Sequence, residues 1–196
     1  MSYFRHTKQG ENFTMATICL YGAASDRISD DYRDDVFALG AEMGTRGHKM
    51  IYGAGATGLM GAAARGMDSV GGHVIGVTPH FMHELEPVYD CTELINTETM
   101  AERKNIMEKY GEAFVIVPGG IGTFDEFFQV LTLKELGRLG KKPIVLFNVD
   151  GYYNPLVDAI RYGFKRGFIR PGALELFHVC DTPAEVLDII EKELAE

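Results

Sequence analysis

The sequence predicts an α/β fold in which strands and helices alternate along one domain. Short apolar runs recur through the 196 residues without the polar–apolar alternation of a half-exposed strand. Segments with apolar residues at helical spacing separate these runs. Strands that are buried on both faces need crossover helices on both sides of the sheet. We therefore expect a Rossmann-like, doubly wound parallel sheet with helices on both faces.

The expected elements follow in order from the N-terminus. The first residues are polar and lack the apolar centre of a signal peptide, so we expect a flexible leader at 1–15 and a single domain at 16–196. The first helix is expected at 30–45, where apolar residues recur at helical spacing. Expected strands lie at 17–21, 49–52, 73–78, 113–117, 143–148 and 176–180, with a loop or short strand within 79–96.

The remaining helices have their own start signals. An alanine-rich helix follows Gly58 and ends near the next pair of glycines. Thr97 or Thr99 is the expected N-cap of the helix after it. Pro183 is expected to start the last helix, because proline fits the first helical turn. Two more helices are expected after the turns at 118–123 and 151–155.

Composition restricts the class of function. The formal net charge of −9 disfavours broad binding to nucleic acid or to anionic membranes, but it permits a small anionic ligand held by a few local cations. The sequence has neither an apolar run long enough to span a membrane nor a metal-ligand spacing of Cys and His. Its three cysteines are scattered, which fits a reducing compartment. We therefore expect a cytoplasmic protein without a metal site.

A first glycine-rich turn matches the G-x-G-x-x-G fingerprint at residues 53–58, between a strand and a helix. A dinucleotide site also needs an acidic residue at the end of the following strand, where this chain has Pro79 and His80. A classical NAD site is therefore disfavoured. Two interpretations stay open for this turn: glycines for close helix–strand packing, or one wall of a mononucleotide cleft.

A second glycine-rich turn has the sequence Pro-Gly-Gly-Ile-Gly-Thr at 118–123 and follows the apolar strand at 113–117. Its backbone can approach a ligand closely, and the free N–H groups and dipole of the next helix favour an anion, most often phosphate. Asp125 and Glu126 lie in the first helical turn, where acids commonly serve only as caps. Because they would repel a bound phosphate, a further use is indicated. Both turns and the small residues at 22–25 follow strands, so all three can line one cleft.

The sequence around the second turn resembles the Lonely Guy family, whose members are cytokinin riboside 5'-monophosphate phosphoribohydrolases and are often mislabelled as lysine decarboxylases. The turn and its acids match the family pattern P-G-G-x-G-T-x-x-E, and Met100, Arg103 and Lys104 match M-x-x-R-K just upstream. These motifs in this order are specific to the superfamily, and the resemblance spans roughly residues 17–190. The first strand is followed by Ala23 where the family usually has serine, which removes a hydroxyl. Residues 53–61 and 76–79 also match the family.

The resemblance implies hydrolysis of the N-glycosidic bond of a nucleoside 5'-monophosphate, a cytokinin riboside monophosphate or AMP, to a free base and ribose 5-phosphate. It implies that Arg103 and Glu126 form the catalytic pair, that no cofactor is needed and that the chain forms a homodimer. The residues that the resemblance implies in nucleotide binding are Glu84, Met100, Lys104, Gly119, Gly120, Ile121, Gly122, Thr123, Phe124, Asp125 and Thr132.

The implied roles agree with the chemistry of the residues. Glycoside cleavage passes through an oxocarbenium-like transition state, which a carboxylate near the anomeric carbon stabilises. Glu126 lies about one short sugar away from a phosphate bound at the turn, and it can either attack directly or activate water. Arg103 stays protonated at ordinary pH, so its expected role is electrostatic: it clamps the phosphate or the ribose hydroxyls.

Two other functions are alternatives to this one. A nucleotide-binding sensor or carrier on the same fold would keep the glycine-rich turns and use Glu126 only as a helix cap. A lysine decarboxylase would need a lysine that forms a Schiff base with pyridoxal phosphate, and no lysine of the chain has a context that favours this chemistry. Phe127 and Phe128 hint at a surface for self-association, although at least one of them is expected in the core.

Overall fold

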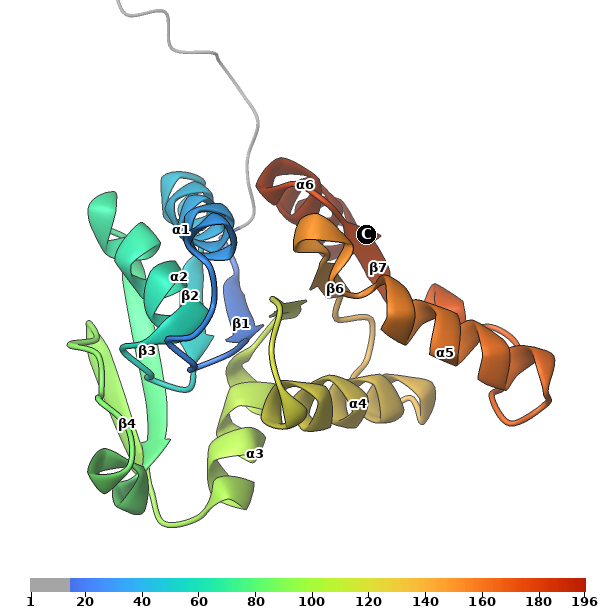
Figure 1. The fold of residues 1–196 in the computed structure, drawn as a ribbon, viewed down its shortest axis with the longest axis horizontal. Coiled ribbons are helices and arrows are strands. Elements are labelled where there is room, and N and C mark those ends of the chain that lie inside the picture. Colours follow the sequence, from blue (N-terminus) through green and yellow to red (C-terminus); the bar gives the residue numbers. More distant parts are fainter. Residues whose placement is uncertain (1–14) are drawn as a thin grey trace, which may run out of the picture.

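The computed structural model describes residues 15–196, so the expected leader at 1–15 lies outside the described residues except for Met15. Strands and helices alternate along this range, as the sequence predicts (Figure 1). The strands are β1 (Thr17–Tyr21), β2 (Lys49–Tyr52), β3 (His73–Pro79), β4 (Glu93–Thr97), β5 (Ala113–Ile116), β6 (Ile144–Phe147) and β7 (His178–Cys180). The helices are α1 (Asp30–Thr45), α2 (Gly58–Ser69), α3 (Met100–Tyr110), α4 (Ile121–Glu135), α5 (Asn154–Lys165) and α6 (Pro183–Leu194). Short 3-10 helices are η1 (His80–Glu84), η2 (Val149–Gly151) and η3 (Ala173–Glu175).

All pairs of neighbouring strands are parallel, and their spatial order is β4-β3-β2-β1-β5-β6-β7. The register places Ile18 of β1 between Met50 of β2 and Ala113 of β5. The chain adds strands outward from β1 in one direction as far as β4 and then in the other from β5, so the order reverses between β1 and β5. These findings confirm the doubly wound parallel sheet in a single α/β domain.

The ends of the elements differ from the expected ones by a few residues. β7 begins at His178 rather than at 176, and β5 and β6 are also shorter than expected. Thr99, not Thr97, is the N-cap of α3, because its side chain accepts a hydrogen bond from the Glu102 N–H at 3.1 Å. α6 begins at Pro183, as the sequence predicts.

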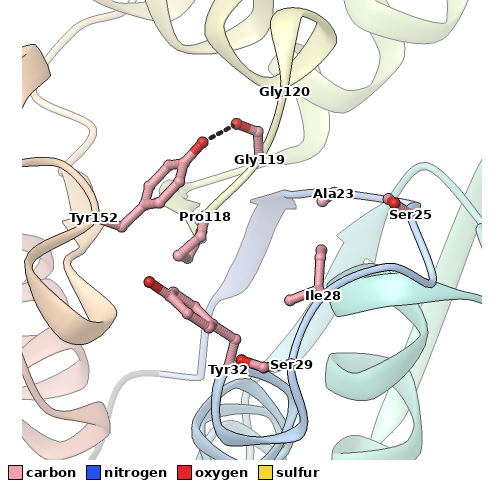
Figure 2. A pocket seen from close by; sticks show the side chains of 9 residues that line it. All are labelled: Ala23, Ser25, Ile28, Ser29, Tyr32, Pro118, Gly119, Gly120 and Tyr152. Carbon is pink, nitrogen blue, oxygen red and sulfur yellow. Dashed lines mark hydrogen bonds between the residues drawn. The ribbon is translucent and has the colours of Figure 1, made fainter.

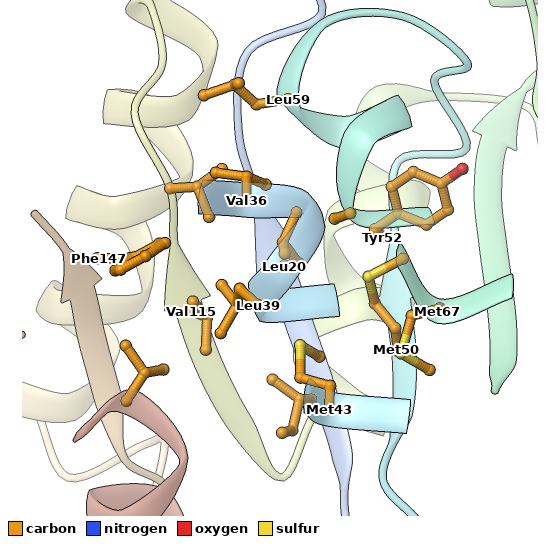
Figure 3. Packing of buried hydrophobic residues seen from close by; sticks show 14 of the residues in the cluster. Leu20, Val36, Leu39, Met43, Met50, Tyr52, Leu59, Met67, Val115 and Phe147 are labelled. Carbon is orange, nitrogen blue, oxygen red and sulfur yellow. The ribbon is translucent and has the colours of Figure 1, made fainter. Parts of the chain in front are cut away.

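Two hydrophobic cores hold the layers together. α1, α2 and α6 cover one face of the sheet, and α3, α4 and α5 cover the other (Figure 1). Alternate residues of β1 point to opposite faces, so that Ile18 and Leu20 lie in the first core whereas Cys19 and Tyr21 lie in the second. Figure 3 shows the first core, where side chains of α1 and α2 meet those of the central strands. Each fully buried large side chain contributes about 1.5–3 kcal/mol to stability.

The segments after β1, β2 and β5 lie at the carboxyl edge of the sheet, where a doubly wound fold binds its ligands. Close packing on both faces fixes these segments relative to one another. Within residues 15–196, none of the helices combines the length and the apolarity that a membrane crossing requires.

Candidate active site

A cavity of about 330 Å³ opens beside the point where the strand order reverses. We call it the switch-point cavity. The segment after β1 and the one after β5 form part of its wall, and a hydrogen bond from the Ala23 N–H to the Pro118 carbonyl joins them at 3.2 Å. The expected site residues that line it are Met100, Arg103, Lys104, Gly120, Gly122, Thr123, Asp125 and Glu126.

Arg103 and Glu126 face each other in this cavity from α3 and α4. Each is only 8% exposed, and Arg103 Nη2 lies 3.8 Å from Glu126 Oε1. Arg103 Nη1 also contacts the Met100 sulfur at 3.7 Å, whereas its Nε is buried with no hydrogen-bond partner among the described residues. A buried guanidinium normally has its donors satisfied. Because Arg103 also lines the cavity, its cation suits an anionic or hydroxyl-rich ligand there.

The environment of Glu126 makes its carboxyl group easy to protonate. Burial raises the pKa of Glu126 to about 7, against the lowering effect of the Arg103 cation; nearby Asp125 raises the pKa further, and Lys104 lowers it. A carboxyl group with a pKa near neutrality can accept or donate a proton during a reaction. A carboxyl group that can change its protonation state near neutral pH therefore lies beside the second turn.

Lys104 and Asp125 form an ion pair at 2.9 Å that joins α3 to α4 beside this carboxyl group. The side chain of Lys104 is largely buried, whereas that of Asp125 is mostly exposed. The pair neutralises part of the acidic charge near the second turn, which reduces the repulsion that a bound phosphate would meet. Lys104 thus adds a second cation to the wall of the switch-point cavity.

The second turn leaves its backbone N–H groups free within residues 15–196, whereas its carbonyl groups are bound by the protein. Every backbone carbonyl from 117 to 120 accepts a hydrogen bond from the protein, at 2.6–3.2 Å. The N–H groups of Ile121, Gly122 and Thr123 open α4 and have no partner within the described range. A methyl group placed at Gly120 or Gly122 would meet nothing within 4 Å. This turn therefore combines free donors with open space, as an anion site requires.

The first glycine-rich turn is closed by the protein itself. The Ala23 carbonyl accepts hydrogen bonds from the N–H groups of Leu59 and Met60, at 2.9 and 3.2 Å. Asp26 Oδ1 accepts one from the Gly58 N–H at 3.2 Å. Because these donors at the start of α2 are occupied, the fingerprint glycines serve close packing here. Gly53 also serves the site, since a methyl group there would overlap Arg103 Nη2.

Other expected site residues lie outside the cavity lining. Glu84 is exposed on η1, whereas Glu86, two residues later, is half-buried and lines the cavity. Gly119 is buried and packs against the Thr123 side chain. Thr132 is exposed and lies about two turns along α4 from Glu126. Two further expected site residues also lie outside the lining: Phe124 is half-buried against the second core, and Ile121 is 84% exposed.

Three lining residues were not expected from the sequence: Glu86, Met60 and Met82. The segment 79–96 contains several acidic residues, which make it a candidate for ligand binding. It has no periodicity that shows which acid, such as Glu86, points inward. Met60 follows the fingerprint glycines, where an apolar residue looks like ordinary core. Within residues 15–196, no group of three or more His, Cys, Asp or Glu side chains is arranged to hold a metal ion.

A second pocket of about 360 Å³ adjoins the switch-point cavity (Figure 2). It shares Ala23, Ser25 and Gly120 with the cavity, and Tyr32 and Tyr152 lie next to each other on one side of its wall. All of its lining residues are uncharged, whereas the switch-point cavity is lined by the charged pairs Arg103–Glu126 and Lys104–Asp125.

Sequence comparisons identify relatives for this arrangement. A family model described as "Possible lysine decarboxylase" matches residues 60–190. A probable cytokinin riboside 5'-monophosphate phosphoribohydrolase of Oryza sativa subsp. japonica is 35% identical over 89% of this chain and 72% of its own length. A cytokinin riboside 5'-monophosphate phosphoribohydrolase of Arabidopsis thaliana is also 35% identical, over 89% of this chain and 81% of its own length.

Solved structures share the fold at lower identity. The molybdenum cofactor carrier protein of Chlamydomonas reinhardtii superposes with a TM-score of 0.71 at 24% identity, over 93% of this chain and 100% of its own. The molybdenum cofactor binding protein of Rippkaea orientalis superposes with a TM-score of 0.70 at 19% identity, over 93% of this chain and 99% of its own. At these identities the likeness shows the fold alone.

Proposed function

Since the chain belongs to the Lonely Guy family of phosphoribohydrolases, we propose that it hydrolyses the N-glycosidic bond of a nucleoside 5'-monophosphate to a free base and ribose 5-phosphate. The observation that carries this proposal is the pair of Arg103 and Glu126, 3.8 Å apart and beside the free N–H groups of α4. A cation, a carboxyl group of tunable charge and an anion cradle are the three parts that the reaction needs.

We infer a place in the cavity for each part of the substrate. The 5'-phosphate binds to the N–H groups at 121–123, helped by the helix dipole and by Lys104. The ribose then lies along the cavity wall toward Glu126, with its anomeric carbon near the carboxylate. Arg103 holds the ribose or phosphate oxygens and fixes the substrate in this orientation.

Glu126 acts on the bond in its ionised form. Its charge stabilises the oxocarbenium-like transition state while the bond between C1' and the base nitrogen breaks. The base leaves with the electron pair of that bond and takes up a proton. A water molecule adds its oxygen to C1' and gives up a proton, for which a carboxylate with a pKa of about 7 is a suitable acceptor.

The far wall of the cavity suits the base. Met60, Met82 and Met100 are apolar side chains that adapt to the shape of their ligand. They fit an adenine ring either bare, as in AMP, or with an apolar substituent on its exocyclic amine, as in a cytokinin riboside monophosphate. Glu86 adds one hydrogen-bond acceptor to this wall.

The test is an assay of free base released from AMP and from N6-isopentenyl-AMP. Glu126→Gln and Arg103→Ala should each lower kcat/KM about a thousandfold while keeping the native circular dichroism spectrum. Normal turnover by Glu126→Gln would remove the mechanism. Saturable AMP binding without base release by the wild type would indicate a sensor or carrier instead.

A matched pair of variants tests which acid of the 79–96 segment contacts the nucleotide. Since Glu86 lines the cavity and Glu84 does not, Glu86→Gln should raise the KM for AMP several-fold, and Glu84→Gln should leave it unchanged. The reverse result would support the assignment of Glu84 that the family resemblance implies.

We also propose that the protein forms a homodimer in the cytoplasm. Phe127 is fully buried, which confirms that one residue of the phenylalanine pair belongs to the core, whereas Phe128 is 42% exposed. Exposed apolar side chains at Phe81, Leu85 and Phe128 offer area for a partner copy. The three cysteines are free, which suits a reducing compartment. Light scattering after size-exclusion chromatography tests the dimer, and a monomeric mass would contradict it.

A further inference from the structure

We propose that Tyr152 is a positioning residue that aims the anion cradle of the second turn at the substrate phosphate. The inference deepens the proposed function and rests on it for the identity of the ligand. The inference is based on a hydrogen bond of 2.6 Å, in which the Tyr152 hydroxyl donates to the Gly119 carbonyl (Figure 2). Tyr152 lies outside α4, in the segment between β6 and α5.

The bond fixes the direction of the peptide group between Gly119 and Gly120. In a trans peptide the carbonyl and the following N–H point in opposite directions, and no described peptide of this chain is cis. Because the Gly119 carbonyl points toward Tyr152 and the second pocket, the Gly120 N–H points away from them. Gly120 also lines the switch-point cavity, so its donor joins those at 121–123.

The peptide needs this support because glycine flanks it on both sides. Two adjacent glycines let a peptide plane rotate at little cost. A methyl group at Gly119 would overlap the Thr123 side chain, whereas one at Gly120 would meet nothing within 4 Å, so the peptide is open on its Gly120 side. Without the hydroxyl, the Gly119 carbonyl would be free to turn toward the phosphate and repel it.

The chain holds Tyr152 in place through an unusual backbone. Asp150 and Gly151, the two residues before it, have φ of +51° and +69°. Asp150 thus adopts a left-handed conformation that is costly for a residue with a side chain. The Asn148 side chain accepts a hydrogen bond from the Tyr153 N–H at 2.8 Å and fixes the other end of the turn. Tyr32 supports the Tyr152 ring edge-on, with centroids 6.4 Å apart.

Tyr152 differs from its neighbour Tyr153, which has a structural role. Tyr153 is fully buried, and its hydroxyl donates to the Val117 carbonyl at 2.7 Å. Tyr152 is 38% exposed and lines the second pocket, so its hydroxyl contributes little to the core. Its hydrogen bond therefore matters for the direction of one peptide rather than for folding.

The experiment compares wild type, Tyr152→Phe and the control Tyr162→Phe, which removes a hydroxyl from an exposed position of α5. Calorimetric titration measures binding of ribose 5-phosphate, and base-release kinetics use AMP and adenosine. Tyr152→Phe should weaken ribose 5-phosphate binding and raise the KM for AMP about five- to tenfold, with kcat little changed. It should leave the KM for adenosine, which has no phosphate, at the wild-type value. Tyr162→Phe should match the wild type throughout.

Several results would overturn the proposal. Unchanged ribose 5-phosphate affinity in Tyr152→Phe would do so, and so would equal losses for AMP and adenosine, which would indicate a general structural role. If Tyr152→Phe does not fold, 4-aminophenylalanine at position 152 replaces it, since its para amino group lies where the hydroxyl does and can also donate, and full phosphate affinity is then expected. A wild type that binds ribose 5-phosphate but releases no base would refute the hydrolase alone. The phosphate-specific loss in Tyr152→Phe would then still support the positioning role.

Discussion

Two glycine-rich turns leave the same edge of the sheet and lead into helices, but only one of them is open to a ligand. At residues 53–58 the first donors of α2 are bound by the Ala23 carbonyl and the Asp26 side chain. At residues 118–123 the first donors of α4 have no partner among the described residues, and the turn's carbonyls are bound elsewhere. An anion site is therefore defined by which backbone groups the protein leaves unbound, and glycine content alone does not define it.

The glycines of the two turns consequently do different work. In the closed turn, Gly53 and Gly58 admit other parts of the protein: the Arg103 guanidinium and the segment after β1. In the open turn, the space at Gly120 and Gly122 is available to a ligand. Substitution by alanine adds one methyl group at each position and separates these roles.

Gly53→Ala should have the largest effect. The added methyl group would displace Arg103 Nη2, the atom nearest to Glu126. Since the guanidinium is the flexible end of a side chain, we expect the protein to fold and kcat/KM to fall about a thousandfold, as for loss of the cation itself. Activity and thermal unfolding measured together test this. Near-normal turnover would show that Arg103 has room that the structure does not indicate.

Gly58→Ala should instead damage the fold. Gly58 has φ of +58°, and a methyl group there would collide with the backbone at Ala23 and Ala24. Strain and collision together should lower the free energy of unfolding by about 3–4 kcal/mol. Denaturant unfolding measures the loss. A variant as stable as the wild type would mean that the closed turn is not tightly packed.

Glu126, beside the open turn, should make both stability and activity depend on pH. Its pKa is about 7 in the folded protein and about 4.5 when exposed, so the native state keeps a proton that the unfolded state loses between these values. Stability should therefore fall as pH rises from 4.5 to 7, by about 3 kcal/mol relative to Glu126→Gln. Unfolding curves of both proteins at several pH values test this, and parallel curves would refute it.

The activity of the wild type should change with pH in the opposite direction. Its kcat/KM should rise as pH increases through about 7, because the carboxyl group of Glu126 ionises there.

Gly122→Ala should have the smallest effect on stability and a moderate effect on ligand affinity. The methyl group meets open space in the first turn of α4, where alanine is the better helix former, so stability should rise by about 0.5 kcal/mol. Ribose 5-phosphate should bind about tenfold more weakly, because the methyl group enters the space beside the donors. Thermal unfolding would measure the gain in stability, and calorimetric titration would measure the loss of ribose 5-phosphate affinity. Unaltered binding would place the phosphate elsewhere.

The sequence predicts the fold well because buried parallel strands carry unbroken apolar runs, which are local signals. It also predicts the cleft, because the carboxyl ends of parallel strands meet at one edge. The inward position of Glu86 was not predictable, since its segment has no periodicity. The link between Gly53 and Arg103 was not predictable either, because the two residues lie 50 positions apart and meet only through packing. The hydrogen bond of Tyr152 was not predictable because it joins residues 33 positions apart, although the Asp150-Gly151 pair is a typical signal for left-handed backbone.

Ala23 ties the closed turn to the open one through a single residue. Its N–H binds the Pro118 carbonyl, and its own carbonyl binds the start of α2. The second turn and the start of α2 therefore cannot move apart without breaking these bonds. The loop after η1, which carries Glu86, is joined to the first turn in the same way: the Ala56 N–H donates to the Pro87 carbonyl and the Tyr89 N–H to the Ala54 carbonyl, both at 2.9 Å. Backbone hydrogen bonds therefore hold the segments around the switch-point cavity together before a ligand binds, so that a ligand would meet a preformed site.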